Sequence, residues 1–202
     1  MQANFYTQLS SGFDREAIAF ETPDGATVTY GEVDRASARA ANALEGLGLE
    51  PGDRVSVIAR KSLTYLWIYL GCLRGGFIFH PLNPGYTARE LEFFFGNAGT
   101  RVLIFDPALA DTVISASANI SSIKRRIELT ATGGGEFDEL CRTGAETYND
   151  RACDFDVTAA LLYSSGTTGQ PKGIRITHGA LAANAATLAD AWGFSAEDVL
   201  VH

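Results

Sequence analysis

The stretch RVSVIARKSLTYLWIYLGCLRGGFIFHPL, Arg54 to Leu82, indicates the fold class. Its first six residues alternate and are rich in β-branched side chains, which is typical of a strand. The residues from Leu63 to Leu73 are apolar on every side over about three turns, so we expect a helix buried between other elements. Gly75 and Gly76 end this helix, and FIFHPL then predicts a second short strand. A strand, a buried helix and another strand predict an α/β architecture.

The alternation of helix and strand continues on both sides of this stretch. Upstream, Thr29 and Glu32 have the spacing of a capping box, and apolar residues then recur at helical spacing until Gly48. Downstream, Thr87 and Glu90 repeat the same spacing before the run RVLIFD. Such a short, almost continuously apolar run is typical of a parallel strand that is covered on both faces. We therefore expect a mostly parallel sheet flanked by helices.

The residues from about Ser115 to Asp150 show a weaker pattern. TATGGGEF predicts a loop, FDELC predicts a short helix, and IKRRIEL is typical of a solvated strand or loop face. We interpret this region as a surface excursion from the α/β domain.

Regular structure returns at DVTAALLYSS, which predicts an apolar strand. After the following loop, IRIT can pair as a short strand, and GALAANAATLADAWGF has helix-forming composition up to Gly193. Val199 to Val201 then look like the start of a buried strand. Because a self-contained domain seldom stops there, we interpret residues 1–202 as one domain that is incomplete at its C-terminal end.

Composition narrows the class of protein. The chain has 202 residues, 46% of them hydrophobic, and a net charge of −8 that disfavours binding to nucleic acids or anionic membranes. It has no apolar stretch of about 18 residues and no signal-like N-terminus, so we expect a cytoplasmic protein without a membrane span. The three widely spaced cysteines form no C-x-x-C pair and are expected to be reduced and structural: Cys72, Cys141 and Cys153.

The loop within YSSGTTGQPKG, Tyr163 to Gly173, has the composition of an anion cradle. Its glycines let successive backbone N–H groups point inward, its hydroxyl residues add donors, and Lys172 supplies a positive charge. The stretch from Val157 to Ala189 contains no Asp or Glu, although the average composition would place about four there. The alternative interpretation is a mobile connection between two strands. The pattern is not a Walker A loop, because Pro171 stands where the second glycine would be.

The string YSSGTTGQPKG resembles the phosphate-binding motif of the adenylate-forming enzymes, which include acyl-CoA synthetases, luciferases and peptide-synthetase adenylation domains. The resemblance extends over most of the chain. TYGEVDRASARAANAL is similar to the N-terminal helix of the family, LRGGFIFHPLNPGYTARELEFFFGNA to its second motif, and THGAL with Asn184 to the segment after the loop. Within the family, HPLNPGYTARELEF and WGFSAEDVLVH look most like malonyl-CoA synthetases. The resemblance implies the N-terminal part of an AMP-binding domain.

The resemblance also implies chemistry. A carboxylate would attack Mg-ATP to give an acyl-adenylate, and CoA would then displace AMP, as in a malonyl-CoA or fatty acyl-CoA ligase. The substrates would be a small-molecule carboxylate and a nucleotide, with ATP and Mg²⁺ as cofactors and CoA as co-substrate. Ser164 would be a hydroxyl ligand of Mg²⁺. Ser164 would thus be one of the cofactor-binding residues. The phosphates themselves would be contacted by six other residues: Ser165, Gly166, Thr167, Thr168, Gly169 and Lys172.

The sequence departs from the family by what it lacks. It contains no aromatic-rich histidine motif, acidic metal ligand, ribose-binding aspartate or adenylation lysine, so no complete set of catalytic residues is present. We expect the 202-residue chain alone to be inactive and its activity to require the C-terminal part of the enzyme. The alternative is a non-catalytic nucleotide- or phosphate-binding module that needs a partner segment. A hydrolase is disfavoured because no G-x-S-x-G elbow is present.

The remaining polar and aromatic candidates are interpreted as structural. The three histidines are scattered and are expected to be polar residues at element ends: His80, His178 and His202. Trp67 and Trp192 suit core and helix-end packing. Tyr163, at the end of the strand before the loop, is expected to anchor that loop.

Overall fold

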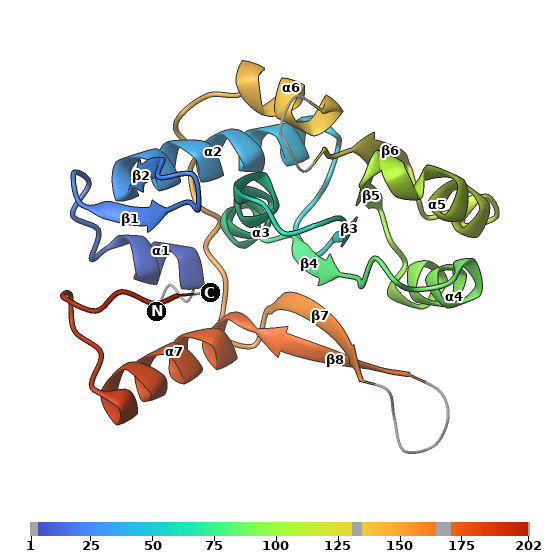
Figure 1. Ribbon diagram of the computed structural model, residues 1–202. Helices are drawn as coiled ribbons and strands as arrows, with labels where there is room; N and C mark the ends of the chain where they lie inside the picture. The colour runs from blue at the N-terminus through green and yellow to red at the C-terminus, as the bar shows by residue number, and fades with distance from the viewer. Residues whose placement is uncertain (1–3, 131–134, 165–170, 202) are drawn as a thin grey trace.

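The computed structural model describes residues 4–130, 135–164 and 171–201 and has a six-stranded sheet at its centre (Figure 1). The strand order is β6-β5-β3-β4-β7-β8, and every neighbouring pair is parallel except β7 and β8, which are antiparallel. The strand bounds are β3 Arg54–Ile58, β4 Ile78–Pro81, β5 Val102–Phe105, β6 Arg125–Glu128, β7 Thr158–Ser164 and β8 Lys172–Thr177. The predicted α/β class with a mostly parallel sheet is confirmed.

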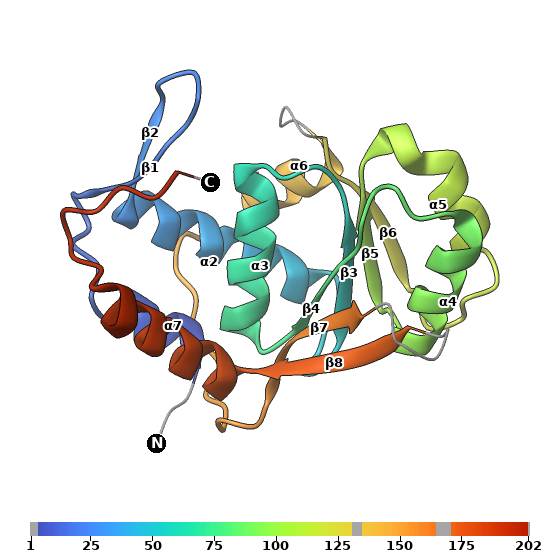
Figure 2. The ribbon, with the colours of Figure 1, turned by 60° about the horizontal axis from the view of Figure 1, so that its bottom comes forward.

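Helices cover both faces of the sheet (Figure 2). Helices α2 (Tyr30–Gly46), α3 (Leu63–Gly75) and α6 (Glu136–Thr143) lie on one side. Helices α4 (Ala88–Ala98) and α5 (Ala110–Ser117) lie on the other, and the short 3₁₀ helix η1 (Pro107–Leu109) precedes α5. Side chains of β5 alternate between the two layers, with Ile104 toward α2 and α3 and Leu103 toward α4. Strand β5 is therefore buried on both faces, as its apolar sequence predicts.

The two predicted capping boxes open α2 and α4. Thr29 accepts a hydrogen bond from the Glu32 backbone N–H while the Glu32 carboxylate accepts one from the Thr29 backbone N–H, and Thr87 and Glu90 repeat the arrangement. Helices α2 and α3 approach closely through small residues. A Cβ added to Gly71 would lie 2.9 Å from the backbone nitrogen of Ala41. Any side chain at position 71 would thus push the two helices apart.

The interpretation of residues 115–150 as a surface excursion is wrong in part. Strand β6 extends the parallel sheet beside β5, and Phe137 of α6 is completely buried in the core. Because β6 lies at the edge of the sheet, Arg125 and Arg126 are exposed and Ile127 is the buried residue of the strand. The solvated strand face predicted for IKRRIEL and the short helix predicted for FDELC are both confirmed.

The N-terminal region contains elements that the sequence patterns did not predict. Helix α1 (Phe5–Ser10) is followed by an antiparallel hairpin of β1 (Ile18–Glu21) and β2 (Thr27–Thr29). Arg74 of α3 is almost fully buried and ion-paired to Asp34 at 3.0 Å and Asp150 at 2.7 Å. Its guanidinium lies 4.4 Å from the ring centroid of Tyr6 in α1. A buried ionic cluster therefore holds α1 against α2 and α3.

The C-terminal region follows the prediction only as far as Gly193. Helix α7 (His178–Trp192) ends there, with Gly193 in the left-handed conformation at φ +66°. The buried strand predicted from Val199 is wrong, because residues 199–201 form no strand and are 77–94% exposed. The physical reason is that no strand or helix of the described residues pairs with or covers this segment.

The cysteine prediction is confirmed within the described residues, where Cys72, Cys141 and Cys153 are all free thiols. Burial raises the pKa of each, most strongly at the fully buried Cys72, so the thiols stay protonated. No helix in the ranges 4–130, 135–164 and 171–201 is long and apolar enough to cross a membrane.

Candidate functional site

The β7–β8 hairpin brings two of the predicted site residues to one edge of the sheet. Strands β3, β4, β5 and β7 are parallel, so their carboxyl ends meet at a common edge, where Ser164 is the last residue of β7. Lys172 begins β8 and is paired with Ser164 in the antiparallel register. Ligands of open α/β sheets bind outside the carboxyl ends of the strands. The predicted phosphate contacts between the two strands lie outside the described residues: Ser165, Gly166, Thr167, Thr168 and Gly169.

The sheet has a topological switch point at this edge. From β3 the chain crosses α3 to β4 on one side, then returns through α4 to β5 on the other side of β3. The two crossovers lie on opposite faces, so the connections after β3 and β4 diverge, and ligands of open α/β sheets bind at such a switch point. Because β7 is the next neighbour of β4, the stem of the hairpin lies beside this switch point.

Tyr163 fixes the stem of the hairpin to helix α4. Its ring centroid lies 4.8 Å from that of Phe94, and its hydroxyl donates a 2.6 Å hydrogen bond to the side-chain oxygen of Asn97. Partial burial raises the pKa of the Tyr163 phenol, so the hydroxyl remains a donor. The residue before Ser164 is thus held by both a ring contact and a polar contact. Tyr163 therefore anchors the end of β7, while the loop that it was predicted to anchor lies outside the described residues.

His80 lies beneath the same edge in a buried polar chain. Its Nδ1 atom is 2.7 Å from the Ser56 hydroxyl, which in turn is 2.7 Å from the Thr100 hydroxyl, and its ring lies 5.4 Å from that of Tyr163. Burial lowers the pKa of His80 to about 4, so the imidazole is neutral near pH 7. Among the described residues its Nε2 atom has no hydrogen-bond partner. The residue is buried within the sheet, which supports a structural interpretation.

His178 also has a structural position, at the start of α7. Its Nδ1 atom accepts a 3.0 Å hydrogen bond from the backbone N–H of Phe5, and burial lowers its pKa. His178 therefore ties the end of the hairpin to α1. Trp67 packs against the core as predicted, whereas Trp192 is 68% exposed and contacts only the Phe194 ring among the aromatic contacts found in the described residues.

The charge around the hairpin suits an anion. Lys172 is exposed at the start of β8, and the described residues of the stretch 157–189 carry no carboxylate side chain. Arg175, the next cation along β8, donates a 2.7 Å hydrogen bond to the Thr158 hydroxyl at the start of β7. Lys172 thus supplies a positive charge at the carboxyl edge without an acidic neighbour in the hairpin strands.

The described residues offer little to a metal ion on their own. Ser164 is half-buried at the end of β7 and could contribute one hydroxyl ligand. Within residues 4–130, 135–164 and 171–201, no three or more His, Cys, Asp and Glu residues gather closely enough to hold a cation. A magnesium ion at this edge would fit only with most of its ligands from another source, such as the phosphates of a nucleotide.

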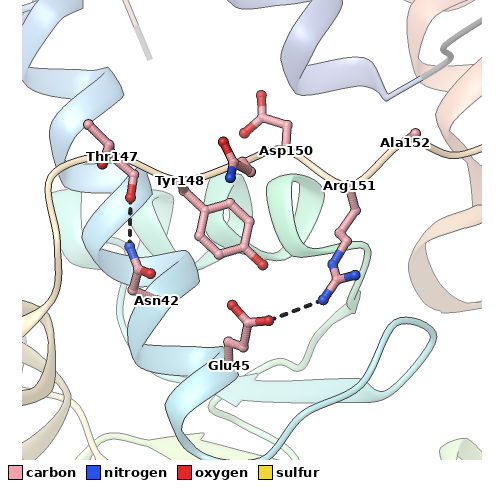
Figure 3. A pocket seen from close by; sticks show the side chains of 8 residues that line it. Asn42, Glu45, Thr147, Tyr148, Asp150, Arg151 and Ala152 are labelled. Atoms are coloured by element: carbon pink, nitrogen blue, oxygen red, sulfur yellow. Dashed lines mark hydrogen bonds and ion pairs between the residues drawn. The ribbon is translucent and has the colours of Figure 1, made fainter.

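A hollow lined by none of the hairpin residues is shown in Figure 3. It has a volume of about 540 Å³ and lies between α2 and residues 147–152. Glu45 and Arg151 pair at 3.1 Å, the Asn42 amide donates to the Thr147 carbonyl at 3.0 Å, and the Tyr148 ring points between the two charged groups. The opposite charges of Glu45 and Arg151 already neutralise each other in this hollow, so it offers little attraction to an anion. We therefore place the candidate site at the carboxyl edge of the sheet.

Sequence patterns missed the part of the site that α4 supplies. Phe93, Phe94 and Asn97 contact Tyr163 across a wide separation in the chain. The capping box at Thr87 and Glu90 predicted the helix, but the role of Asn97 had no local signal, because polar residues near helix ends are common.

Comparison with known proteins gives a consistent result. The family model of AMP-binding enzymes matches residues 5–202. The 3-methylmercaptopropionyl-CoA ligase of Ruegeria lacuscaerulensis is 32% identical over 92% of this chain and 37% of its own length. Apo MatB from Rhodopseudomonas palustris is 33% identical with a TM-score of 0.93, and the match covers 100% of this chain and 40% of that one. An ATP-bound structure of the same MatB matches equally well. The chain thus spans about two fifths of the length of each of these relatives.

Proposed function

The chain belongs to the family of AMP-binding enzymes, and on that basis we propose that it carries the phosphate-binding part of an ATP-dependent acid-CoA ligase. The observation that carries the proposal is the pairing of Ser164 with Lys172 at the carboxyl edge of a parallel sheet. Tyr163 holds this pair against α4. Residues 1–202 would form the N-terminal part of the AMP-binding domain.

The proposed reaction has two steps. A carboxylate oxygen attacks the α-phosphorus of ATP, the bond to the bridging oxygen breaks, and pyrophosphate leaves. The sulfur of CoA then attacks the acyl carbon of the adenylate, and AMP leaves. In the first step Lys172 would neutralise charge that develops on the leaving pyrophosphate. Donors from Ser165, Gly166, Thr167, Thr168 and Gly169 would add to this stabilisation.

Bound magnesium would supply positive charge that offsets the charge of the phosphates. Ser164 would add a hydroxyl ligand, and its place at the end of β7 is fixed by the anchored neighbour Tyr163. The described residues supply no identified site for CoA, which would come from the remainder of the enzyme. Because ATP and CoA are cytoplasmic metabolites, we place the reaction in the cytoplasm.

The substrate is proposed to be a small carboxylic acid. The likeness to MatB, together with HPLNPGYTARELEF, favours malonate. Other relatives bear the names 3-methylmercaptopropionyl-CoA ligase and feruloyl-CoA synthase at similar identity, so the carboxylate is the shared feature. A fatty acid is the second candidate within this class.

A second candidate function is a non-catalytic nucleotide- or phosphate-binding module. The observation that favours it is the exposed Lys172 paired with Ser164 at the carboxyl edge, where the hairpin strands carry no carboxylate that would repel an anion. Such a module would keep the Ser164 and Lys172 edge and take the rest of its site from a partner segment. Nucleotide binding without ligation by the 202-residue chain would support it.

Thermal unfolding with and without Mg-ATP tests the proposal. Saturation at about 100 times Kd should stabilise the folded chain by about 2.7 kcal/mol, which corresponds to several degrees in Tm. Lys172→Ala should remove most of the shift, whereas Lys124→Ala should retain it, because Lys124 is exposed beside the far edge strand β6. A shift that survives Lys172→Ala would contradict the assigned role. If the wild-type chain shows no shift in Tm with Mg-ATP, the shift should appear once the chain is joined to the remaining part of a relative. If the joined protein shows no shift either, the proposed function is wrong.

A further inference from the structure

The end of β7 has little backbone connection to the centre of the sheet. Among the described residues, β4 and β7 share one register pair, Phe79 with Ala160. The strand continues to Ser164, its last residue at the carboxyl edge. Residues 161–164 therefore have a backbone partner only in β8. Contacts between side chains must then fix the position of this part of the strand.

Tyr163 makes these side-chain contacts. Helix α4 supplies three of its partners: Phe93, Phe94 and Asn97. Its ring centroid also lies 5.4 Å from that of His80, with 50° between the ring planes. Of the ring contacts and side-chain hydrogen bonds that Tyr163 makes among the described residues, only the contact with His80 comes from a strand. His80 therefore links the end of β7 directly to the centre of the sheet.

The imidazole of His80 is fixed from the other side. Its Nδ1 atom is 2.7 Å from the Ser56 hydroxyl on β3, and this hydroxyl is 2.7 Å from that of Thr100, just before β5. All three side chains are completely buried. Because β4 lies between β3 and β7, the nitrogen that faces Ser56 is turned away from β7, and Nε2 is on the side of Tyr163.

The surroundings of Nε2 show which ring nitrogen has the proton. Burial lowers the pKa of His80 to about 4, so the neutral imidazole has one N–H group near pH 7. The Tyr163 hydroxyl donates to Asn97 and has no second proton for an unprotonated Nε2. The face of the Tyr163 ring is electron-rich and can accept an N–H group. The proton is therefore assigned to Nε2, with the Ser56 hydroxyl donating to Nδ1.

We propose that His80 is a positioning residue for the phosphate-binding edge, because its Nε2–H group faces the Tyr163 ring and fixes where Ser164 and Lys172 lie. The role rests on the proposed function, since these two residues belong to the proposed site. Lys172 is paired with Ser164 in the register, so a shift of the end of β7 moves both. His80 itself touches no ligand in this role and acts through Tyr163.

Backbone hydrogen exchange on the 202-residue chain without nucleotide tests this role. The side chains introduced by His80→Gln and His80→Leu have similar volumes, and only glutamine keeps an N–H donor near the position of Nε2. We expect exchange at residues 161–163 and 173–175 to accelerate about fivefold in His80→Leu and less than about twofold in His80→Gln. The rates are taken relative to those of the buried strand β5, because a purely structural role would accelerate exchange in β5 and the hairpin together.

Two further variants make the test specific. Ile127→Ala removes a buried side chain from β6 at the other edge of the sheet, so the hairpin should exchange no faster relative to β5. Ser56→Ala removes the hydroxyl that fixes Nδ1 and should accelerate exchange at residues 161–163 about threefold. This variant decides the question if His80→Leu does not fold. Equal hairpin exchange in His80→Leu and His80→Gln would overturn the proposal, as would equal acceleration in β5 and the hairpin.

Nucleotide affinity gives the second readout. The Kd for Mg-ATP is measured on the 202-residue chain, or on the joined protein if only that one binds. It should rise about fivefold in His80→Leu and stay within about twofold of the wild type in His80→Gln. An unchanged Kd in His80→Leu would overturn the positioning role. If neither wild-type protein binds Mg-ATP, the proposed function is wrong, while the exchange experiment still decides whether His80 fixes the end of β7.

Discussion

Strands β5 and β8 belong to the same sheet but have opposite surroundings. All four residues of β5 are buried between two layers of helices, whereas four of the six residues of β8 are exposed. Helices α2, α3 and α6 pack on one face of the β3–β6 region and α4 and α5 on the other. In β8 the first four residues are exposed, and Ile176 near its end packs against the core on the α2 and α3 side. Burial of apolar area therefore stabilises the first region far more than the second.

The two regions also differ in where chemistry can occur. The β5 region is apolar and closed, since all four residues of the strand are buried between two layers of helices. The β7–β8 hairpin is open to solvent, has Lys172 at its end and is fixed at Tyr163. A site that must admit a charged nucleotide cannot be closed by apolar layers before its ligand arrives. This difference predicts that substitutions in the β5 region will mainly lower stability, whereas substitutions in the β7–β8 hairpin will mainly weaken ligand binding.

The largest expected effect is a loss of stability from the core. Phe95→Ala in α4 removes a fully buried ring and should lower the free energy of unfolding by about 3–5 kcal/mol. Ile174→Ala in β8 should cost less than about 0.5 kcal/mol, because its side chain is largely exposed. Urea denaturation followed by circular dichroism measures both. If Phe95→Ala does not fold, Phe95→Leu should still lose about 1–2 kcal/mol. Equal losses at the two sites would contradict the comparison.

The next effect is a loss of stability in acid through His80. Burial lowers its pKa from 6.5 to about 4, so the unfolded chain binds a proton between these values that the folded chain does not. Stability therefore decreases as the pH falls through this window, by about 3 kcal/mol for this group. Unfolding experiments at pH 7 and pH 4.5 on the wild type and His80→Gln isolate the contribution. The variant should lose less stability than the wild type on acidification; an equal loss would show that other groups dominate.

Sequence patterns predicted the closed β5 region well, because its capping residues mark where helices begin and its apolar residues are the ones that the fold buries. The Thr29 and Glu32 pair and the Thr87 and Glu90 pair gave the starts of α2 and α4, and RVLIFD gave β5. For β6 they predicted only a solvated strand or loop face, and with Ile127 as the one buried residue of four they did not reveal that this strand extends the parallel sheet. They also failed at residues 199–201, because an apolar run predicts a buried strand only if another element covers it.

The candidate site was predictable only from its own residues. The glycines, hydroxyls and Lys172 form a local pattern, and Tyr163 was expected to anchor the loop. Its partner Asn97 lies 66 residues earlier in the chain, so their contact depends on the sheet order that places β7 near α4. The position of β8 at the edge of the sheet could likewise not be predicted, since it depends on the order of all the strands and not on the sequence of one strand.

A smaller loss of stability is expected when a side-chain hydrogen bond to a backbone N–H group is removed from each of the two regions. Thr87→Ala removes the side-chain oxygen that accepts a hydrogen bond from the Glu90 backbone N–H at the start of α4, and it should cost about 1 kcal/mol. Ser195→Ala removes a similar contact to the Glu197 backbone N–H in the exposed C-terminal segment, and it should cost nothing measurable. Paired urea midpoints check this. A comparable loss at Ser195 would mean that the C-terminal segment unfolds together with the core.

The smallest expected effect on stability is at Trp192, where the effect on association should be largest. Trp192→Ser removes a ring that is 68% exposed, so the free energy of unfolding should change by less than about 0.5 kcal/mol. The same change removes one ring of the exposed Trp192 and Phe194 pair, so the chain should bind less of a hydrophobic dye and associate less with itself. Dye fluorescence and light scattering measure these two quantities, with Ile114→Ser as the matched control on α5. If both variants reduce the two signals equally, general exposure of apolar side chains explains the association. If only Trp192→Ser does, the exposed ring pair at the end of α7 is a surface for association, in contrast to the closed β5 region.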